Sequence, residues 1–273
     1  RVLFRSAITI TGILLTQTDR LIVSHLLPLN EFGVYVVAGT LAAGLYVVIS
    51  PMFSIVFPRI AALWSKGDMT GAAQLYHGAS QVMALLVLPL TAVLVCFPAQ
   101  SLFVLTDDLA ISRQGVWVLV FLTLGAAFNG IMNIPYALQL AAGWTDLSVW
   151  LNAGAIVILI PITWWAATRF GAAGAAAGWA LLNLGYVMVT PQILHRRLLP
   201  ADKWSWYWRG VLMPGAISFL AASALAALWQ VGFASRWVTL IELAVCWVVC
   251  VLATFACLVR LHPAARQFFR KKM

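Results

Sequence analysis

Two charged side chains lie in the middle of an apolar segment near the start of the sequence. Asp19 and Arg20 fall within residues 7–28, a run of mostly apolar side chains. At about 100° per residue, one helix face carries Thr9, Thr16, Arg20 and Ser24, with Gln17 and Asp19 on its flanks. An ionisable group inside a membrane costs on the order of 2.5–3.5 kcal/mol, so it needs a compensating partner. The stripe predicts either a wet, ligand-binding cavity or a buried ion pair between helices.

A second polar group lies in the run 114–140 and carries no charge. Asn129, Asn133 and Tyr136 are spaced i, i+4 and i+7, so they share one face of a helix, with Gln139 to one side. Pro135 removes one backbone hydrogen bond from the interior of that helix. These side chains could bind a polar ligand, or they could form hydrogen bonds between helices.

Patterns that would indicate bond chemistry are missing from the sequence. It has no phosphate-binding loop, no H-E-x-x-H and no G-x-S-x-G, and its histidines fall on separate segments: His25, His77, His195 and His262. Asp107 and Asp108 read as a solvated turn, and Cys246 and Cys250 as small packing residues. We therefore expect no metal, no cofactor and no enzymatic activity.

The composition requires these residues to be placed on membrane-spanning helices. Of 273 residues, 63% are hydrophobic and 9% are charged, whereas a soluble domain carries about 25% charged residues. This predicts an all-α integral membrane protein with about eight spans, near residues 7–28, 32–58, 75–97, 114–140, 147–168, 172–193, 210–230 and 238–259. Gly174 and Gly178 in the sixth span have the spacing typical of close helix packing.

The basic residues predict an orientation. The loops after even-numbered spans and the C-terminal tail hold 11 Lys and Arg residues, against 3 on the other side. The positive-inside rule therefore places the C-terminus in the cytoplasm. The net charge of +9 thus indicates topology and not nucleic-acid binding. Trp204, Trp206 and Trp208 lie near a span end, which favours anchoring at the membrane interface.

The first six residues do not resemble the start of a natural protein. Residues 1–6 (RVLFRS) match one frame of a common sequencing-library adapter end, and no initiator Met precedes the first span. We expect them to be read-through sequence, with a native loop as the alternative. We also expect an upstream part of the protein to be missing.

Several short motifs resemble a transporter family. They are residues 17–42 (QTDRLIVSHLLPLNEFGVYVVAGTLA), 57–68 (FPRIAALWSKGD), 75–80 (LYHGAS) and 133–143 (NIPYALQLAAG). In this order they resemble the C-terminal half of bacterial polysaccharide and oligosaccharide-lipid flippases, in the multidrug/oligosaccharidyl-lipid/polysaccharide exporter superfamily. The resemblance implies that residues 7–197 form a six-helix lobe and that residues 198–273 add two helices and a basic tail. The N-terminal lobe of the same chain would be the missing partner.

The resemblance also implies a substrate and roles for residues. Members move an undecaprenyl-diphosphate-linked glycan to the periplasmic face of the inner membrane by alternating access. Arg20 would contact the anion, because guanidinium donors fit phosphate oxygens, and Asp19 would balance its charge or carry a coupling ion. The expected glycan contacts are Gln17, Asn129, Asn133 and Tyr136, while Arg59 would draw the headgroup in from the cytoplasmic leaflet.

Three alternatives stay open. A cation-coupled multidrug exporter of the same superfamily would have an aromatic, apolar cavity. A membrane glycan polymerase or acyltransferase would need interfacial His or acidic residues and long periplasmic loops, which the short loops and scattered histidines disfavour. A membrane subunit without transport activity would tolerate apolar residues in place of Asp19 and Arg20.

Overall fold

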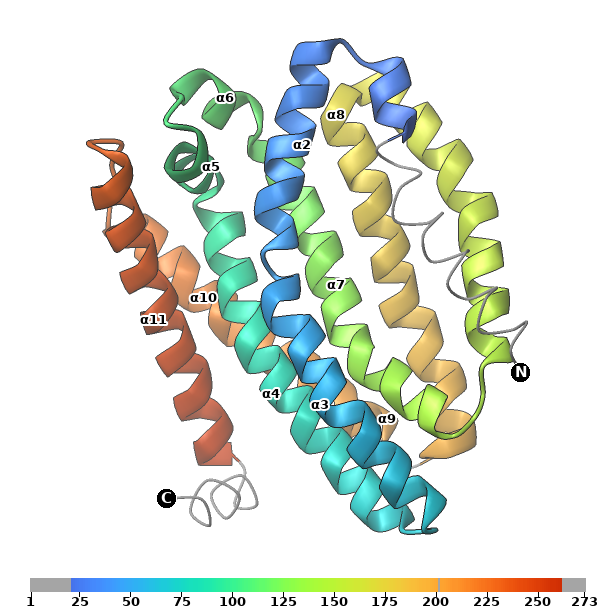
Figure 1. Cartoon of the computed structure of the whole chain (residues 1–273). Coiled ribbons are helices and arrows are strands. Elements are labelled where there is room, and N and C mark those ends of the chain that lie inside the picture. Colours follow the sequence, from blue (N-terminus) through green and yellow to red (C-terminus); the bar gives the residue numbers. More distant parts are fainter. Residues whose placement is uncertain (1–20, 201, 262–273) are drawn as a thin grey trace.

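The computed structural model describes residues 21–200 and 202–261, and helices account for nearly all of them. Residues 21–26 are helical and lead into the elements labelled in Figure 1. These elements are α2 (Leu29–Ala43), α3 (Tyr46–Ser65), α4 (Met69–Cys96), α5 (Pro98–Thr106), α6 (Leu109–Gln114), α7 (Val116–Ala141), α8 (Asp146–Leu198), α9 (Lys203–Tyr207), a π-helical turn (Trp208–Leu212), α10 (Met213–Leu228) and α11 (Arg236–Leu261). The prediction of an all-α membrane protein is confirmed.

Helix lengths match the thickness of a bilayer. Within the described residues, six helical segments are long and apolar enough to cross a membrane, and one of them, α8, has 53 residues. The predicted spans 75–97, 114–140 and 238–259 each match one of these helices within about six residues, and 147–168 and 172–193 both fall within α8. The predicted span 32–58 is instead divided between α2, which ends at Ala43, and α3, which begins at Tyr46. The predicted span 210–230 corresponds to the helical segment Lys203–Leu228. Most of the first predicted span, residues 7–28, lies outside the described residues.

Gly171 divides α8 into two antiparallel halves. Its backbone has φ +60° and ψ −147°, a conformation that is essentially restricted to glycine. A Cβ at this position would lie 2.9 Å from the Glu31 Oε2 atom. The chain therefore doubles back here, so that residues 146–170 (the first half) and residues 172–198 (the second half) form two crossings (Figure 1).

The segment between the third and fourth predicted spans is more ordered than the turn expected from its sequence. It forms the two short helices α5 and α6, and Asp108 caps α6 by accepting hydrogen bonds from the Ala110 and Ile111 amides at 2.7 and 3.2 Å. Asp107 adopts the left-handed conformation at the end of α5. Both acidic residues thus serve the backbone of a turn, as predicted, since capping satisfies amides at a helix start.

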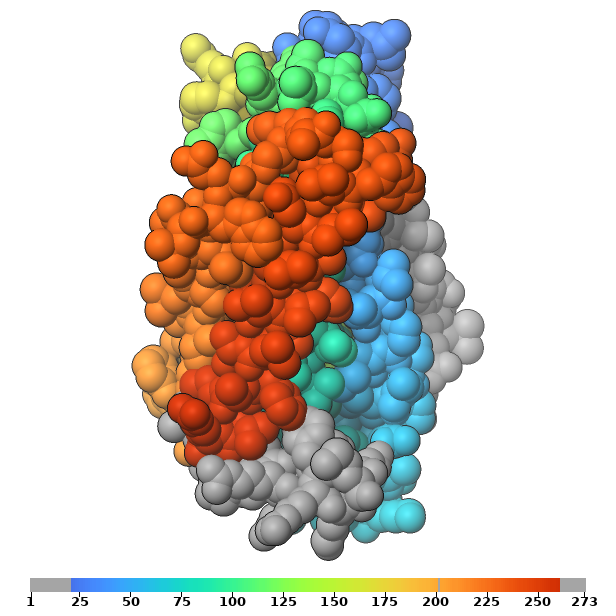
Figure 2. Space-filling view, turned by 90° about the vertical axis from the view of Figure 1, so that its left-hand side faces the viewer, coloured from blue at the N-terminus to red at the C-terminus, as the bar shows by residue number. Residues whose placement is uncertain are grey.

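Helices α4 and α7 form the centre of the bundle. In their most apolar windows, 61% and 67% of residues are buried, against 17–22% in the other candidate spans. Helices α10 and α11 pack beside α4 and cover one face of the molecule (Figure 2). Cys246 and Cys250 are fully buried there with Ala92 and Val93, so their predicted packing role is confirmed.

Close packing also explains the glycines of the second half of α8. A Cβ on Gly174 would collide with the Ala166 carbonyl, and one on Gly178 would lie 3.2 Å from Thr163 Oγ1. The two halves of α8 can therefore approach each other closely only because these positions lack side chains.

Basic residues gather at one end of the helices. Seven of the ten Lys and Arg residues in the described part of the chain lie at the end where α3, α7 and α11 finish, shown at the bottom of Figure 1: Arg59, Lys66, Arg196, Arg197, Lys203, Arg209 and Arg260. We call this the basic end. Arg113, Arg169 and Arg236 lie towards the opposite end, so the asymmetry expected from the sequence is present in three dimensions.

Candidate functional site

A polar cavity lies between α7 and the two halves of α8. Its volume is about 290 Å³. Its lining is formed by Asn129, Met132, Asn133, Tyr136, Gln139, Ser148, Leu151, Asn152, Trp179, Leu182, Asn183, Tyr186 and Thr190. The hairpin at Gly171 is what brings the residues from both halves of α8 to one place beside α7.

A chain of hydrogen bonds positions the amides in the middle of these helices. The Tyr46 hydroxyl on α3 donates to Asn129 Oδ1 at 3.1 Å, and Asn129 Nδ2 donates to Asn183 Oδ1 at 3.1 Å. Asn183 Nδ2 in turn donates to the Trp179 carbonyl at 2.9 Å. This chain joins α3, α7 and the second half of α8, and it fixes the orientation of the two cavity amides.

The turn that joins α7 to α8 is fastened to the cavity wall at the basic end. Gln139 Nε2 donates to the Trp144 carbonyl at 2.9 Å and to Ser148 Oγ at 2.6 Å. The Arg197 guanidinium carbon lies 4.3 Å from the centre of the Trp144 ring. An exposed cation therefore stands beside the turn whose two flanking helices line the cavity.

Two hydroxyl groups complete the wall formed by α8. The Tyr186 hydroxyl donates to Asn152 Oδ1 at 2.9 Å and so links the two halves of the helix. Thr190 is only 5% exposed, and its Oγ1 atom has no hydrogen-bond partner within the protein. A buried polar group without a partner costs about 1–3 kcal/mol. The Oγ1 atom is itself enclosed, so a ligand or water can bind it only when the Thr190 side chain turns towards the cavity.

The chemistry of the lining is neutral. Among the residues that the structure describes, the lining includes amides, hydroxyls and aromatic rings but no Asp, Glu, Lys, Arg or His. Amides and hydroxyls can each donate and accept hydrogen bonds, as a polyhydroxylated ligand requires. Tyr136, Trp179 and Tyr186 add flat apolar surfaces. The cavity is therefore suited to uncharged polar groups such as those of a sugar.

The structure places the predicted binding residues in three different situations. Asn129, Asn133 and Tyr136 all line the cavity from α7, and the Tyr136 ring also stacks on Phe53 with ring centres 5.9 Å apart. Arg59 is exposed on α3 and is not part of the cavity lining. Gln17, Asp19 and Arg20 lie outside the described residues. The binding roles of all of these residues stay predictions.

Sequence reasoning missed the contribution of α8 to this cavity. Asn183, Tyr186 and Thr190 are spaced i, i+3 and i+7 and therefore share a helix face, which is the same signal that identified the stripe on α7. They follow a segment rich in Ala and Gly, and the span was predicted to serve close helix packing. On the first half of α8, Ser148 and Asn152 are spaced i and i+4 and show the same signal.

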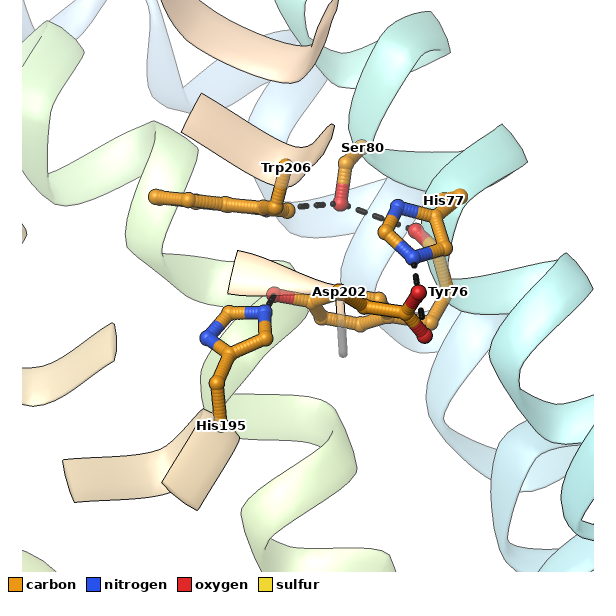
Figure 3. Close-up of polar contacts among 6 residues, drawn as sticks. All are labelled: Tyr76, His77, Ser80, His195, Asp202 and Trp206. Atoms are coloured by element: carbon orange, nitrogen blue, oxygen red, sulfur yellow. Dashed lines mark hydrogen bonds and ion pairs between the residues drawn. The ribbon is translucent and has the colours of Figure 1, made fainter. Parts of the chain in front are cut away.

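A second polar group lies between α4, the end of α8 and α9 (Figure 3). We call it the Trp206 cluster, and it consists of Tyr76, His77, Ser80, His195, Asp202 and Trp206. The Tyr76 hydroxyl lies 3.3 Å from His195 Nε2, and His195 Nδ1 lies 2.8 Å from the Pro191 carbonyl. His77 Nε2 lies 3.3 Å from Asp202 Oδ2, a contact that is an ion pair when His77 is protonated but that lacks hydrogen-bond geometry.

Trp206 corrects one expectation drawn from the sequence. It was expected at the membrane interface, yet its side chain is fully buried and its Nε1 donates to Ser80 Oγ at 3.1 Å. Trp204 and Trp208, in contrast, are 71% and 61% exposed. The prediction was wrong for Trp206 because α9 turns one face towards α4, so that alternate tryptophans of this segment point to opposite environments.

The comparison with known proteins concerns the first part of the chain. Residues 5–108 match a family model described as a polysaccharide biosynthesis protein. No curated protein and no solved structure matches the chain. The match is consistent with the resemblance to polysaccharide flippases for the motifs up to residue 80, and it supports a role in polysaccharide biosynthesis or export. The motif at residues 133–143 lies after the matched range. Every residue that lines the cavity lies after the matched range.

Proposed function

We propose that this protein, similar over residues 5–108 to polysaccharide biosynthesis proteins, is a flippase. It would move a polyprenyl-diphosphate-linked oligosaccharide across the bacterial inner membrane, for the synthesis of a surface polysaccharide. The single observation that carries the proposal is the neutral polar cavity between α7 and the two halves of α8. Amides and hydroxyls of this lining can form hydrogen bonds with a polar occupant, and its aromatic and aliphatic side chains provide apolar surface.

The energetics of crossing a membrane support this assignment. A sugar hydroxyl that enters hydrocarbon without a hydrogen-bond partner costs several kcal/mol, and a glycan carries many of them. Amides and hydroxyls of the cavity, including Asn133, Asn183 and the unpartnered Thr190, can replace the water that these groups lose. The polyprenyl chain needs no such replacement, because it can stay in the surrounding lipid.

Transport would also need groups outside the cavity. Alternating access requires a second set of helices that faces this one, which the family resemblance assigns to a lobe upstream of this sequence. Gln17, Asp19, Arg20 and Arg59 would supply further contacts to the headgroup. The positive-inside rule places the basic end in the cytoplasm, so the cavity would load from the side where lipid-linked glycans are assembled.

The test is to fill the cavity. Asn133→Trp, introduced into the gene of the host, places a bulky ring in the cavity, whereas Leu220→Trp adds the same ring at a position on α10 that is 70% exposed. We expect surface polysaccharide to fall at least about tenfold in the first variant and to stay unchanged in the second, with equal amounts of both proteins in the membrane.

The accumulating intermediate identifies the blocked step. A flippase defect should leave the lipid-linked glycan inaccessible to a glycosidase added to spheroplasts, because the glycan stays at the inner leaflet. If the glycan accumulates in an accessible form, the protein acts after translocation, as a polymerase would. Normal export with Asn133→Trp would refute the role of the cavity.

A further inference from the structure

We propose that Arg197 and Trp144 form a phosphate-binding site at the mouth of the cavity, at the basic end. The inference rests on the proposed function, which it extends by separating two parts of the substrate. The anionic phosphate would bind outside the cavity at Arg197, and the uncharged sugar would bind inside it.

The guanidinium of Arg197 is held by an aromatic ring and is not paired with a carboxylate among the described residues. It lies 4.3 Å from the centre of the Trp144 ring, and within the described part of the chain it forms no ion pair. A guanidinium above an aromatic face is held by a cation–π interaction and keeps its N–H groups available at its edge. Those donors match the oxygens of a phosphate, which Arg can bind through two parallel hydrogen bonds.

Trp144 connects this cation to the cavity wall. Its carbonyl accepts a hydrogen bond from Gln139 Nε2, and the same nitrogen donates to Ser148 Oγ. Both Gln139 and Ser148 line the cavity. Trp144 thus lies on the short turn between α7 and α8, and both of these helices line the cavity.

The register of α8 places Arg197 in line with the cavity. Asn183, Thr190 and Arg197 are seven residues apart in succession, so they follow one stripe of the helix, and each step is about 10 Å along its axis. Asn183 and Thr190 line the cavity, and Arg197 is exposed one step beyond. A ligand that extends along this stripe would meet amides first and the cation at its end.

Among the described residues the cavity lining is neutral, whereas Arg197 offers a cation beside it. A diphosphate in a cavity without a cation would lose its hydration with no compensating charge, which is strongly unfavourable. At Arg197 the phosphate keeps contact with water and gains a charge-assisted hydrogen bond. Arg196, the neighbouring exposed cation, points about 100° away on the helix and has no aromatic support among the described contacts.

The test measures binding of inorganic pyrophosphate to the purified chain in nanodiscs of phosphatidylcholine, by calorimetry and by tryptophan fluorescence. We expect Arg197→Gln to weaken binding about tenfold, because a charge-assisted hydrogen bond is lost. Arg196→Gln is the matched control and should bind as the unchanged protein does. Trp144→Leu should weaken binding less than Arg197→Gln. Equal losses in the two arginine variants would overturn the site in favour of diffuse attraction.

Two further experiments distinguish a lipid headgroup from a substrate diphosphate as the ligand, and test the phosphate site and the flippase proposal independently. If phosphatidylglycerol in the nanodisc abolishes pyrophosphate binding, the site is a lipid-headgroup site and the substrate assignment is wrong; persistence of binding supports it. If Arg197→Gln exports polysaccharide normally while Asn133→Trp does not, the phosphate site is refuted and the flippase stands. If Asn133→Trp exports normally but pyrophosphate binding still depends on Arg197, the flippase proposal fails instead.

Discussion

The cavity and the Trp206 cluster are built from similar side chains, yet they differ in how these are used. In the cluster, the Trp206 indole donates to the Ser80 hydroxyl at 3.1 Å, and Ser80 donates to the Tyr76 carbonyl at 2.8 Å. His77 and Asp202 form a separate contact of 3.3 Å. In the cavity, the same kinds of group surround about 290 Å³ of space, and Thr190 Oγ1 finds no partner.

This difference in hydrogen bonding indicates that the Trp206 cluster stabilises the fold and that the cavity is suited to bind a ligand. Polar groups that contact each other hold α4, α8 and α9 together, although His77 Nε2 forms no hydrogen bond. Polar groups that line a space retain hydrogen-bonding capacity for something else. Changes in the cluster should therefore act on stability, and changes in the cavity should act on transport.

The largest effect is expected from Trp206→Ala. Removing a fully buried tryptophan should lower the free energy of unfolding by about 3–5 kcal/mol, because it leaves a cavity in the core and removes the hydrogen bond from its indole to the Ser80 hydroxyl. Thermal unfolding of the purified protein measures the loss. Trp204→Ala, at a side chain that is 71% exposed, is the control and should change stability little. Equal destabilisation by both variants would mean that α9 is not anchored through Trp206.

An intermediate effect is expected from Thr190→Val, and on transport alone. A hydrogen bond to a ligand is worth about 1 kcal/mol, so export should slow about fivefold. Stability should stay the same or rise, because the unpartnered hydroxyl is unfavourable when it is buried. Thr163→Val is the matched control, because Thr163 is a second buried, unpartnered threonine of α8 and lies outside the cavity lining. If export slows equally in both variants, the position of Thr190 in the cavity lining is not what matters for transport.

The smallest effect is expected from Asp202→Asn. The ion pair with His77 is partly exposed, with 34% of the Asp202 side chain accessible, and such pairs contribute about 0–1 kcal/mol. Stability should fall by less than about 1 kcal/mol, and export should not change. A large loss of export with normal stability would show that the cluster takes part in transport, and the comparison with the cavity would then need revision.

The sequence by itself determined the helices and one wall of the cavity. Hydropathy located the spans, because only apolar helices are stable in a bilayer, and Gly171 fell between two predicted spans. Helical periodicity identified Asn129, Asn133 and Tyr136 as one face, since neighbours at i, i+4 and i+7 share a side whatever surrounds the helix.

Only the tertiary structure decided what each face meets. Asn129 faces Asn183, 54 positions later in the chain, and Trp206 reaches Ser80 across 126 positions. Arg59 carried the same charge as Arg197 in the sequence, but only Arg197 lies above an aromatic ring at the mouth of the cavity. Helical periodicity determines which side chains share a face of one helix. Which segment packs against that face depends on the hairpin at Gly171 and on the packing of α4 and α7, which bring distant segments together.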